Sequence, residues 1–267
     1  MGLFNLATRV IDHKLDEAAR AHAGTLPRLD NDLPLGARVG GLLTLPRADF
    51  ALLDNTLLKV PGDSQMPIVG IGRLRFEADA SLAVYRLYTN LGDTLTGKDT
   101  AFLQVLCRSG NPNDILDVAY YEHLARQFPE SEEEQAAFQG NGFGLGELTF
   151  WLGDDLIAEA GLPSDKTAAL IETGEDGALR YTRDGGGGDY VRPFMATETR
   201  IHDAYGDKGA KLSSAFMLYQ RELSGTKLER LLISFDVVDS QDGKARQAAY
   251  VNYLVGLQLD PARLKAI

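Results

Sequence analysis

The chain has 267 residues, of which 44% are hydrophobic, and its 38 acidic residues outnumber 27 basic ones. This apolar fraction is sufficient for a sizeable core and excludes wholesale disorder, whereas the formal charge of −11 argues against nucleic acid and anionic membranes as partners. The single cysteine excludes an internal disulfide and a thiolate metal cluster.

The amino-terminal segment has the clearest helical pattern. Apolar residues recur at steps of three and four, and Gly24 supplies a stop signal. One stripe of this predicted amphipathic helix contains Leu3, Leu6, Val10, Ile11 and Leu15. The stripe can face the protein's own core, a partner helix or second copy, or a membrane surface, and its mixed-charge polar face is least typical of the last. Because the segment lacks the features of a secretory signal and no apolar stretch is long enough to span a membrane, we expect a cytoplasmic protein.

Proline and polar residues between Thr25 and Pro34 predict a linker between this arm and a globular body. Beyond the linker, short apolar runs separated by Gly, Asp, Asn and Pro predict strands. The expected strands are Ala37–Leu45, Phe50–Val60, Pro67–Phe76, Ala83–Thr89 and Phe102–Cys107, with a polar hairpin-like connection over Leu91–Thr100.

The middle of the chain contains both kinds of pattern. The segment Ile115–Phe128 fits a helix or a strand equally well. Ser131, followed by three glutamates, predicts the capped start of a short helix that ends near Gly140. A flexible glycine-rich loop is then expected to lead into a strand or turn that contains Trp151.

The final third predicts an antiparallel sheet, because β-rich runs follow one another without regular helices between them. These runs are Arg180–Tyr181, Tyr190–Phe194, Leu212–Arg221, Leu228–Val238 and Ala248–Leu259. The predicted fold class is α+β, a predominantly antiparallel sheet with an N-terminal amphipathic helix and one or two short further helices. We expect residues 1–30 to form the helical arm and linker and residues 31–267 a single domain, with a two-lobe split near residues 140–146 left open.

No motif in the sequence specifies a reaction. The glycine-rich runs lack nucleotide-binding spacing, and Gly185–Gly188 lies between two aspartates, which repel phosphate. The histidines show no metal-ligand spacing, although His202 beside Asp203 could form a local acid–base group. Cys107 ends an apolar run, which predicts a buried thiol. We therefore predict no catalytic residues, no metal site and no cofactor, while carboxylate pairs that meet in space stay open.

One charged pair lies within the apolar final third. Arg221 ends the run FMLYQR, and Glu229 lies just before the run LLISF. If these two strands pair across the turn at Ser224–Gly225, the two side chains come close together. We expect a structural ion pair that fixes the strand register, with a ligand site as the alternative.

An ordered series of motifs resembles a known family. The motifs are FLQV at Phe102–Val105, TFWLG with DLI at Thr149–Ile157, MLYQR at Met217–Arg221, ERLLISF at Glu229–Phe235 and VGLQLDPARL at Val255–Leu264. From about Leu33 to its C-terminus the chain resembles the YjfK-like family of bacterial proteins, a family of unknown function. The resemblance implies a setting beside a homologue of the phage-shock coiled-coil protein and other envelope-stress components, sometimes with an ATP-grasp ligase, and it supplies no catalytic residues.

Two functions from different classes follow from these observations. The first is a non-enzymatic partner protein in a phage-shock-like membrane-stress module, whose terminal stripe docks on a helical protein such as the phage-shock-type coiled-coil protein. Such a protein would reach a membrane only through its partner. The alternative is an enzyme or small-ligand-binding protein with a pocket in the antiparallel sheet near Tyr85–Tyr88 and Tyr219–Arg221. Neither function involves nucleic acid or an integral membrane segment, and the first is favoured.

Overall fold

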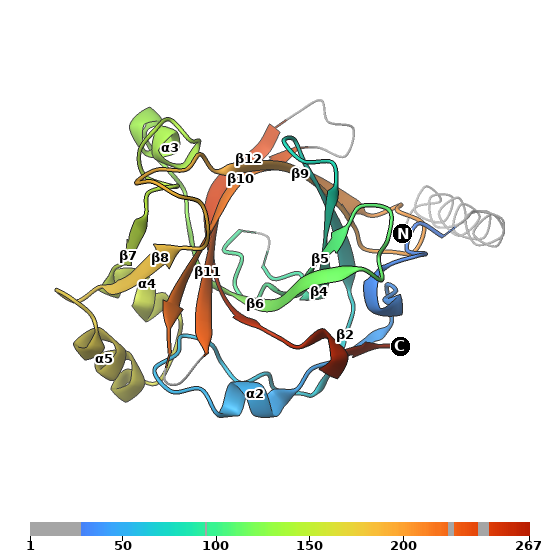
Figure 1. Cartoon of the computed structure of the whole chain (residues 1–267), viewed down its shortest axis with the longest axis horizontal. Coiled ribbons are helices and arrows are strands. Elements are labelled where there is room, and N and C mark those ends of the chain that lie inside the picture. The colour runs from blue at the N-terminus through green and yellow to red at the C-terminus, as the bar shows by residue number, and fades with distance from the viewer. Residues whose placement is uncertain (1–27, 94, 224–226, 240–245) are drawn as a thin grey trace, which may run out of the picture.

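The protein forms a closed antiparallel β-barrel, seen in the computed structural model, which describes residues 28–93, 95–223, 227–239 and 246–267 (Figure 1). Within these residues eight strands form the barrel wall. In order around the wall they are β3 (Gly70–Phe76), β4 (Leu82–Asn90), β5 (Ala101–Arg108), β6 (Ile115–Gln127), β12 (Arg246–Gln258), β11 (Leu228–Asp239), β10 (Gly209–Glu222) and β9 (Phe194–Ile201). The wall closes because β9 pairs with both β10 and β3.

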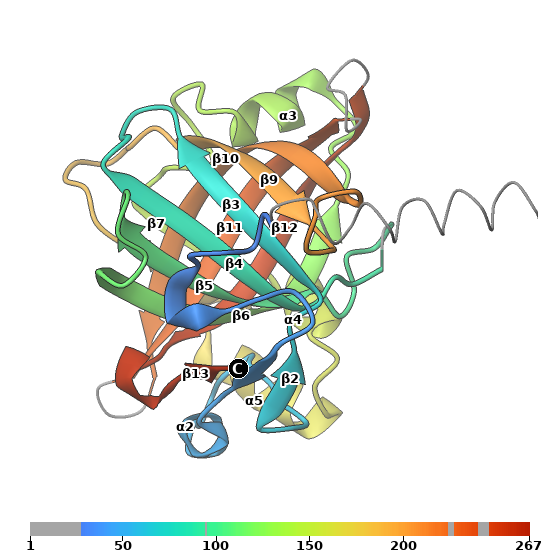
Figure 2. The same cartoon turned by 90° about the vertical axis from the view of Figure 1, so that its right-hand side faces the viewer.

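Most of the other elements cover part of the outside of this wall. Strands β8 (Leu179–Arg183) and β7 (Thr149–Leu152) extend the sheet from β10, while β1 (Leu42–Thr44), β2 (Gln65–Pro67) and β13 (Lys265–Ala266) form a small second sheet. The helices are α2 (Arg47–Ala51), α3 (Glu132–Phe138), α4 (Asp154–Glu159) and α5 (Ser164–Thr173), with 3-10 turns at Pro34–Gly36 and Pro261–Arg263. Figure 2 shows α2, α4 and α5 gathered with the small sheet below the barrel.

The two faces of the barrel wall contain different side chains, because successive residues of a strand point to opposite faces. The outward residues belong to the larger apolar cluster, which they share with the covering elements; it includes Leu103, Val105, Leu231, Ile233 and Val255 from the wall and Leu43, Phe50 and Ile157 from outside it. The inward residues form a smaller cluster that includes Tyr88, Phe102, Tyr121, Leu232 and Leu254. Buried charged residues, among them Arg86, Glu198 and Asp236, lie in the same strands as this inner cluster.

Two glycines of the wall make room for large inward side chains. A Cβ atom at Gly72 would lie 2.1 Å from Glu198 Oε1, and one at Gly256 would lie 2.4 Å from the Tyr121 ring. Both distances are far below van der Waals contact, so any larger residue at either position must displace its neighbour.

The predicted antiparallel sheet with short helices is confirmed, and the predicted N-terminal amphipathic helix lies outside the described residues. The segment Ile115–Phe128, which fitted either structure, is a strand as far as Gln127. The helix predicted after Ser131 is α3, and its first turn is capped by the Ser131 Oγ, which accepts the Glu134 N–H at 3.1 Å. The helices α4 and α5 were not predicted. Among the described residues, no helix is both long and apolar enough to cross a bilayer.

The strand predicted over Phe50–Val60 is wrong. Phe50 lies in α2, and the residues between α2 and β2 belong to no strand. Several of their backbone N–H groups donate to side chains instead. Leu57 N–H donates to Glu229 Oε2 at 2.7 Å, and Lys59 N–H donates to Glu122 Oε1 at 2.6 Å. Leu57 and Leu58 are thus buried as irregular chain, while Leu52 and Val60 are exposed.

Two other predicted strands are misplaced. Only Leu42–Thr44 of the predicted strand Ala37–Leu45 pairs in a sheet. The strand predicted at Tyr190–Phe194 begins only at its last residue and runs on to Ile201. Pro193 precedes this strand, and proline has no N–H to give to a ladder.

Candidate functional site

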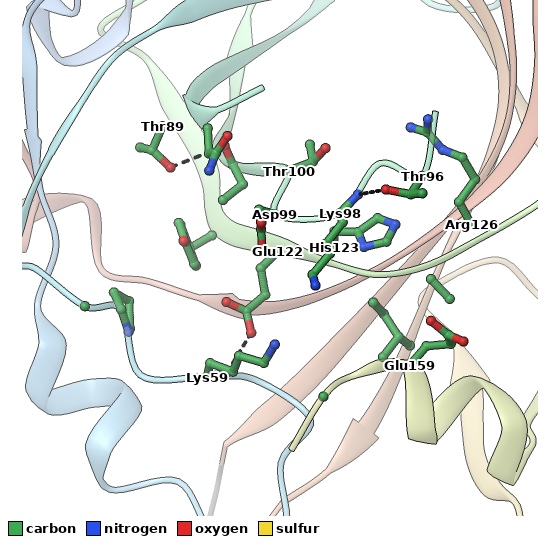
Figure 3. Close-up of a pocket in the computed structure, with 18 of the residues that line it drawn as sticks. Lys59, Thr89, Thr96, Lys98, Asp99, Thr100, Glu122, His123, Arg126 and Glu159 are labelled. Carbon is green, nitrogen blue, oxygen red and sulfur yellow. Dashed lines mark hydrogen bonds between the residues drawn. The ribbon is translucent and has the colours of Figure 1, made fainter. Parts of the chain in front are cut away.

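A pocket of about 930 Å³ opens at one end of the barrel, where β6 meets the segment before β2, the β4–β5 loop and α4 (Figure 3). This volume falls within the range of small-molecule sites, about 300–1,000 Å³. Its floor is made of buried residues, namely Ala101, Tyr120, Leu124, Ala125 and Leu156. Its rim contains charged residues, namely Lys59, Lys98, Asp99, Glu122, Arg126, Asp155 and Glu159. We call this hollow the rim pocket.

Glu122 is the rim-pocket carboxylate held most firmly by the fold. Its backbone lies in register with Ala101 of β5 and Val255 of β12, which fixes where the side chain leaves the wall. One oxygen accepts the Lys59 N–H at 2.6 Å. Burial raises the pKa of Glu122 to about 7, although the Lys59 N–H and the Lys59 charge oppose the shift. Near neutral pH this carboxyl can therefore either donate or accept a hydrogen bond.

His123 leaves the wall on the opposite face from Glu122. A β-bulge follows it, because β12 steps from Leu254 paired with His123 to Tyr253 paired with Ala125, which leaves Leu124 as the extra residue. Burial lowers the pKa of His123 to about 4, and the Arg126 charge adds to the effect. The imidazole is thus neutral at physiological pH. Its Nε2 is buried and has no hydrogen-bond partner among the described residues.

Lys59 and Lys98 bring two ammonium groups to the pocket from separate segments. Figure 3 shows both side chains and that of Glu122 pointing into the same space. Both lysines are exposed, and neither forms a salt bridge within the described part of the chain. The β4–β5 loop that supplies Lys98 is held by Arg126, whose Nη1 donates to the Leu95 carbonyl at 3.1 Å.

The predicted charged pair lies on the outer face of the barrel and does not line this pocket. Arg221 and Glu229 are opposite each other in the β10–β11 ladder, and Arg221 Nε is 2.7 Å from Glu229 Oε1. The same carboxylate also accepts from the Tyr181 hydroxyl at 2.6 Å and, at its other oxygen, from the Thr56 hydroxyl at 2.5 Å and the Leu57 N–H at 2.7 Å. Two donors at each oxygen leave this carboxylate little capacity to bind a ligand.

The other residues that the sequence singled out contribute to the fold and form no site among the described residues. The Asp203 carboxylate accepts the N–H groups of Tyr205, Asp207 and Lys208 and so closes its own loop, rather than bonding to His202. Cys107 is buried, and burial raises the pKa of its thiol to about 11, which makes it unreactive. Within the described ranges no group of His, Cys, Asp and Glu could hold a metal ion. The stripe Leu3, Leu6, Val10, Ile11 and Leu15 lies outside the described residues.

Sequence reasoning missed the rim pocket altogether. The available signal was the pair Glu122–His123 within an otherwise apolar run, and the ambiguity between helix and strand hid it. A strand places the two residues on opposite faces, so the carboxyl and the imidazole do not form an acid–base pair.

The described residues thus define a closed eight-stranded antiparallel barrel with a pocket lined by charged residues at one end. Comparison of the chain with models of protein families, with curated proteins and with solved structures found no match. Its function is therefore inferred from its own residues.

Proposed function

We propose that this protein binds a small molecule with an acidic group and a hydroxyl or amino group in the rim pocket. The observation that supports this most strongly is the convergence of Lys59, Lys98 and Glu122 on one hollow with an apolar floor (Figure 3). Small-ligand sites typically combine an apolar lining with a few converging polar groups.

The two lysines of the rim favour an acidic group in the ligand. The two ammonium groups have no carboxylate partner within the described ranges, and a carboxylate or phosphate can accept charge-assisted hydrogen bonds from both. Asp99 and Glu122 offer acceptors on the same rim, which suits a hydroxyl or amino group on the same ligand. Binding is favoured over catalysis because Glu122 and His123 do not act as a pair.

The test is a thermal-shift screen of the full chain against small carboxylic acids, phosphates and amino acids, followed by calorimetric titration of the compounds that shift the midpoint. A ligand present at a hundred times its Kd stabilises a protein by about 2.7 kcal/mol, which gives an easily measured shift. We expect Lys59→Met and Lys98→Met each to weaken binding at least tenfold. Lys166→Met is the matched control, because Lys166 is an exposed lysine of α5 that does not line the pocket.

Two outcomes would contradict the proposal. One is a screen without a single stabilising compound. The other is a ligand whose affinity is unchanged by both pocket substitutions, since such a ligand binds elsewhere.

A second function rests on a different observation, the apolar stripe Leu3, Leu6, Val10, Ile11 and Leu15. We propose that this stripe docks on a helical protein partner in the cytoplasm, and the resemblance to the YjfK-like family suggests a phage-shock-type coiled-coil protein. The test is a pull-down of that purified protein by the full chain and by a chain without residues 1–24. Val10→Asp should abolish capture, whereas Asp12→Asn on the polar face should preserve it. Equal capture by all variants would refute docking through the stripe.

A further inference from the structure

Charges of both signs line the rim pocket. Its carboxylates are those of Asp99, Glu122, Asp155 and Glu159, and its ammonium groups are those of Lys59 and Lys98. The remaining cation, Arg126, is held by the fold, because its Nε donates to Asn252 at 2.8 Å and its Nη1 to the Leu95 carbonyl at 3.1 Å. Neither lysine forms an ion pair with a carboxylate of the pocket in the part of the chain that the structure describes. One hollow therefore offers a ligand both ammonium groups and carboxylates.

Helix α4 supplies two of the carboxylates from a single face. Asp155 and Glu159 are four residues apart, so their side chains are neighbours on the helix surface, and both line the pocket. Leu156, between them in sequence, is buried and belongs to the pocket floor. The lysines enter from other segments, Lys59 from the one before β2 and Lys98 from the β4–β5 loop. Carboxylates and ammonium groups thus surround a shared apolar floor.

Glu122 is the least exposed of the four carboxylates. Its Oε1 accepts the Lys59 N–H at 2.6 Å, and its Oε2 has no hydrogen-bond partner among the described residues. Burial raises the pKa of Glu122 to about 7 and the Glu229 charge adds to the shift, against the Lys59 N–H and the Lys59 charge. About half of these carboxyls therefore carry a proton at pH 7. A cationic group beside Oε2 would favour the ionised form and release that proton.

We propose that the ligand of the rim pocket is a zwitterionic amino acid with an apolar side chain. Its carboxylate accepts hydrogen bonds from Lys59 and Lys98, its ammonium group donates to Glu122 Oε2, and its side chain covers the floor. This assignment rests on the function proposed above and narrows its ligand. A plain carboxylic acid or a phosphate has no donor group of positive charge for the carboxylates of the rim.

Analogues that lack one charged group test the assignment. Leucine and phenylalanine are titrated calorimetrically into the full chain, together with 4-methylpentanoic and 3-phenylpropanoic acid, which lack the amino group, and 3-methylbutylamine and 2-phenylethylamine, which lack the carboxyl group. We expect at least one amino acid to bind, and at least tenfold more tightly than either of its analogues.

The outcomes separate this inference from the proposed function. A carboxylic acid that binds as tightly as its amino acid would overturn the zwitterion and leave an acidic ligand in place. Failure of both amino acids, when other acidic compounds stabilise the chain, would have the same meaning. If no compound of any class binds, both proposals fall.

Proton release gives an independent readout at Glu122. Titrations at pH 7 in two buffers of different ionisation enthalpy count the protons released, and the wild type should release about half a proton per amino acid bound. Glu122→Gln keeps an oxygen for the Lys59 N–H, should release none and should bind at least tenfold more weakly. Glu172→Gln is the matched control, because Glu172 is exposed on α5 and does not line the pocket. Proton uptake in the wild type would overturn the proposal, since it places the acidic group against Glu122.

Discussion

The inner and outer faces of the barrel wall bury different kinds of side chain. Outside, aliphatic side chains of the wall pack against the helices and the small sheet in one large apolar cluster. Inside, arginines and carboxylates are buried beside a few aromatic and aliphatic residues. Apolar packing tolerates many substitutions of similar volume, whereas a buried polar network is stable only when every member is satisfied. We therefore expect the outer face of each strand to accept substitutions of similar volume more readily than the inner face.

The carboxylates of the inner face form hydrogen bonds to side chains of other strands. Glu198 of β9 accepts from Arg86 and from the Tyr88 hydroxyl of β4, at 2.8 Å and 2.7 Å. Burial opposes ionisation of Glu198, but Arg200 and Arg86 outweigh it and lower its pKa to about 2. Asp236 of β11 accepts from Ser214 of β10 at 2.6 Å and from Asn252 of β12 at 2.7 Å. Each carboxylate thus joins neighbouring parts of the wall.

The largest expected effect comes from breaking the inner face. Glu198→Gln removes the shared carboxylate and leaves the buried Arg86 and the partly buried Arg200 without their ion-pair partner, which should cost about 3–5 kcal/mol of unfolding free energy. Urea denaturation measures the loss. The control is Asp114→Asn at the exposed Arg108–Asp114 pair, where about 0–1 kcal/mol is expected. Equal losses in the two variants would show that the inner charges are not specially important.

Two adjacent leucines of β11 sharpen the comparison. Leu231 belongs to the outer cluster and Leu232 to the inner one, and both are almost fully buried. Leu231→Ala leaves a cavity in tightly packed apolar surroundings and should cost about 3 kcal/mol. Leu232→Ala should cost about 2 kcal/mol, because polar neighbours allow water to enter the space it leaves. Urea denaturation of both variants checks the order, and the reverse order would contradict this account of the two faces.

The last prediction concerns pH and the rim pocket. The folded-state pKa of Glu122, about 7, lies above its ordinary value of 4.5, so the stability due to the protonated carboxyl is complete below pH 4.5 and is lost as the pH rises through 7. Glu122→Gln removes this loss. The unfolding free energy of the variant minus that of the wild type should therefore increase between pH 4.5 and pH 7.

The subtraction isolates Glu122 from its neighbour. His123 has its pKa lowered from 6.5 to about 4, so its contribution falls as the pH decreases, and this term is common to both proteins. A difference that does not vary across this pH range would contradict the burial of Glu122.

Local patterns in the sequence predict the individual strands better than their assembly. The strand predicted over residues 83–89 lies in β4, although β4 is buried on both faces, and the cap at Ser131 marks the start of α3. Closure of the barrel depends on the pairing of β3 with β9, which joins segments more than a hundred residues apart in the chain. No local signal specifies that pairing. The strand predicted after Phe50 is wrong for a related reason, because side chains of distant strands accept hydrogen bonds from the backbone N–H groups of this segment.

The Arg221–Glu229 pair and the rim pocket also differ in how far the sequence could predict them. Arg221 and Glu229 lie on strands that follow one another in the chain and pair directly, so their proximity follows from local pairing. The rim pocket takes Lys59, Lys98 and Glu122 from three segments that meet only in the folded barrel. Sequence spacing cannot report such a meeting, because it depends on the register of strands that are far apart along the chain.

Strand β10 belongs to two parts of the molecule at once. Residues Gly209–Phe216 pair with β9 in the barrel, Tyr219 and Gln220 pair with β8 in the side sheet, and β11 pairs along the other edge of both stretches. The side sheet is joined to β10 by two residue pairs, Tyr219 with Arg183 and Gln220 with Thr182, so it can separate while the ladder between β10 and β11 stays intact. Amide protons of β8 should therefore exchange with solvent faster than those of β9, which is paired with both β10 and β3.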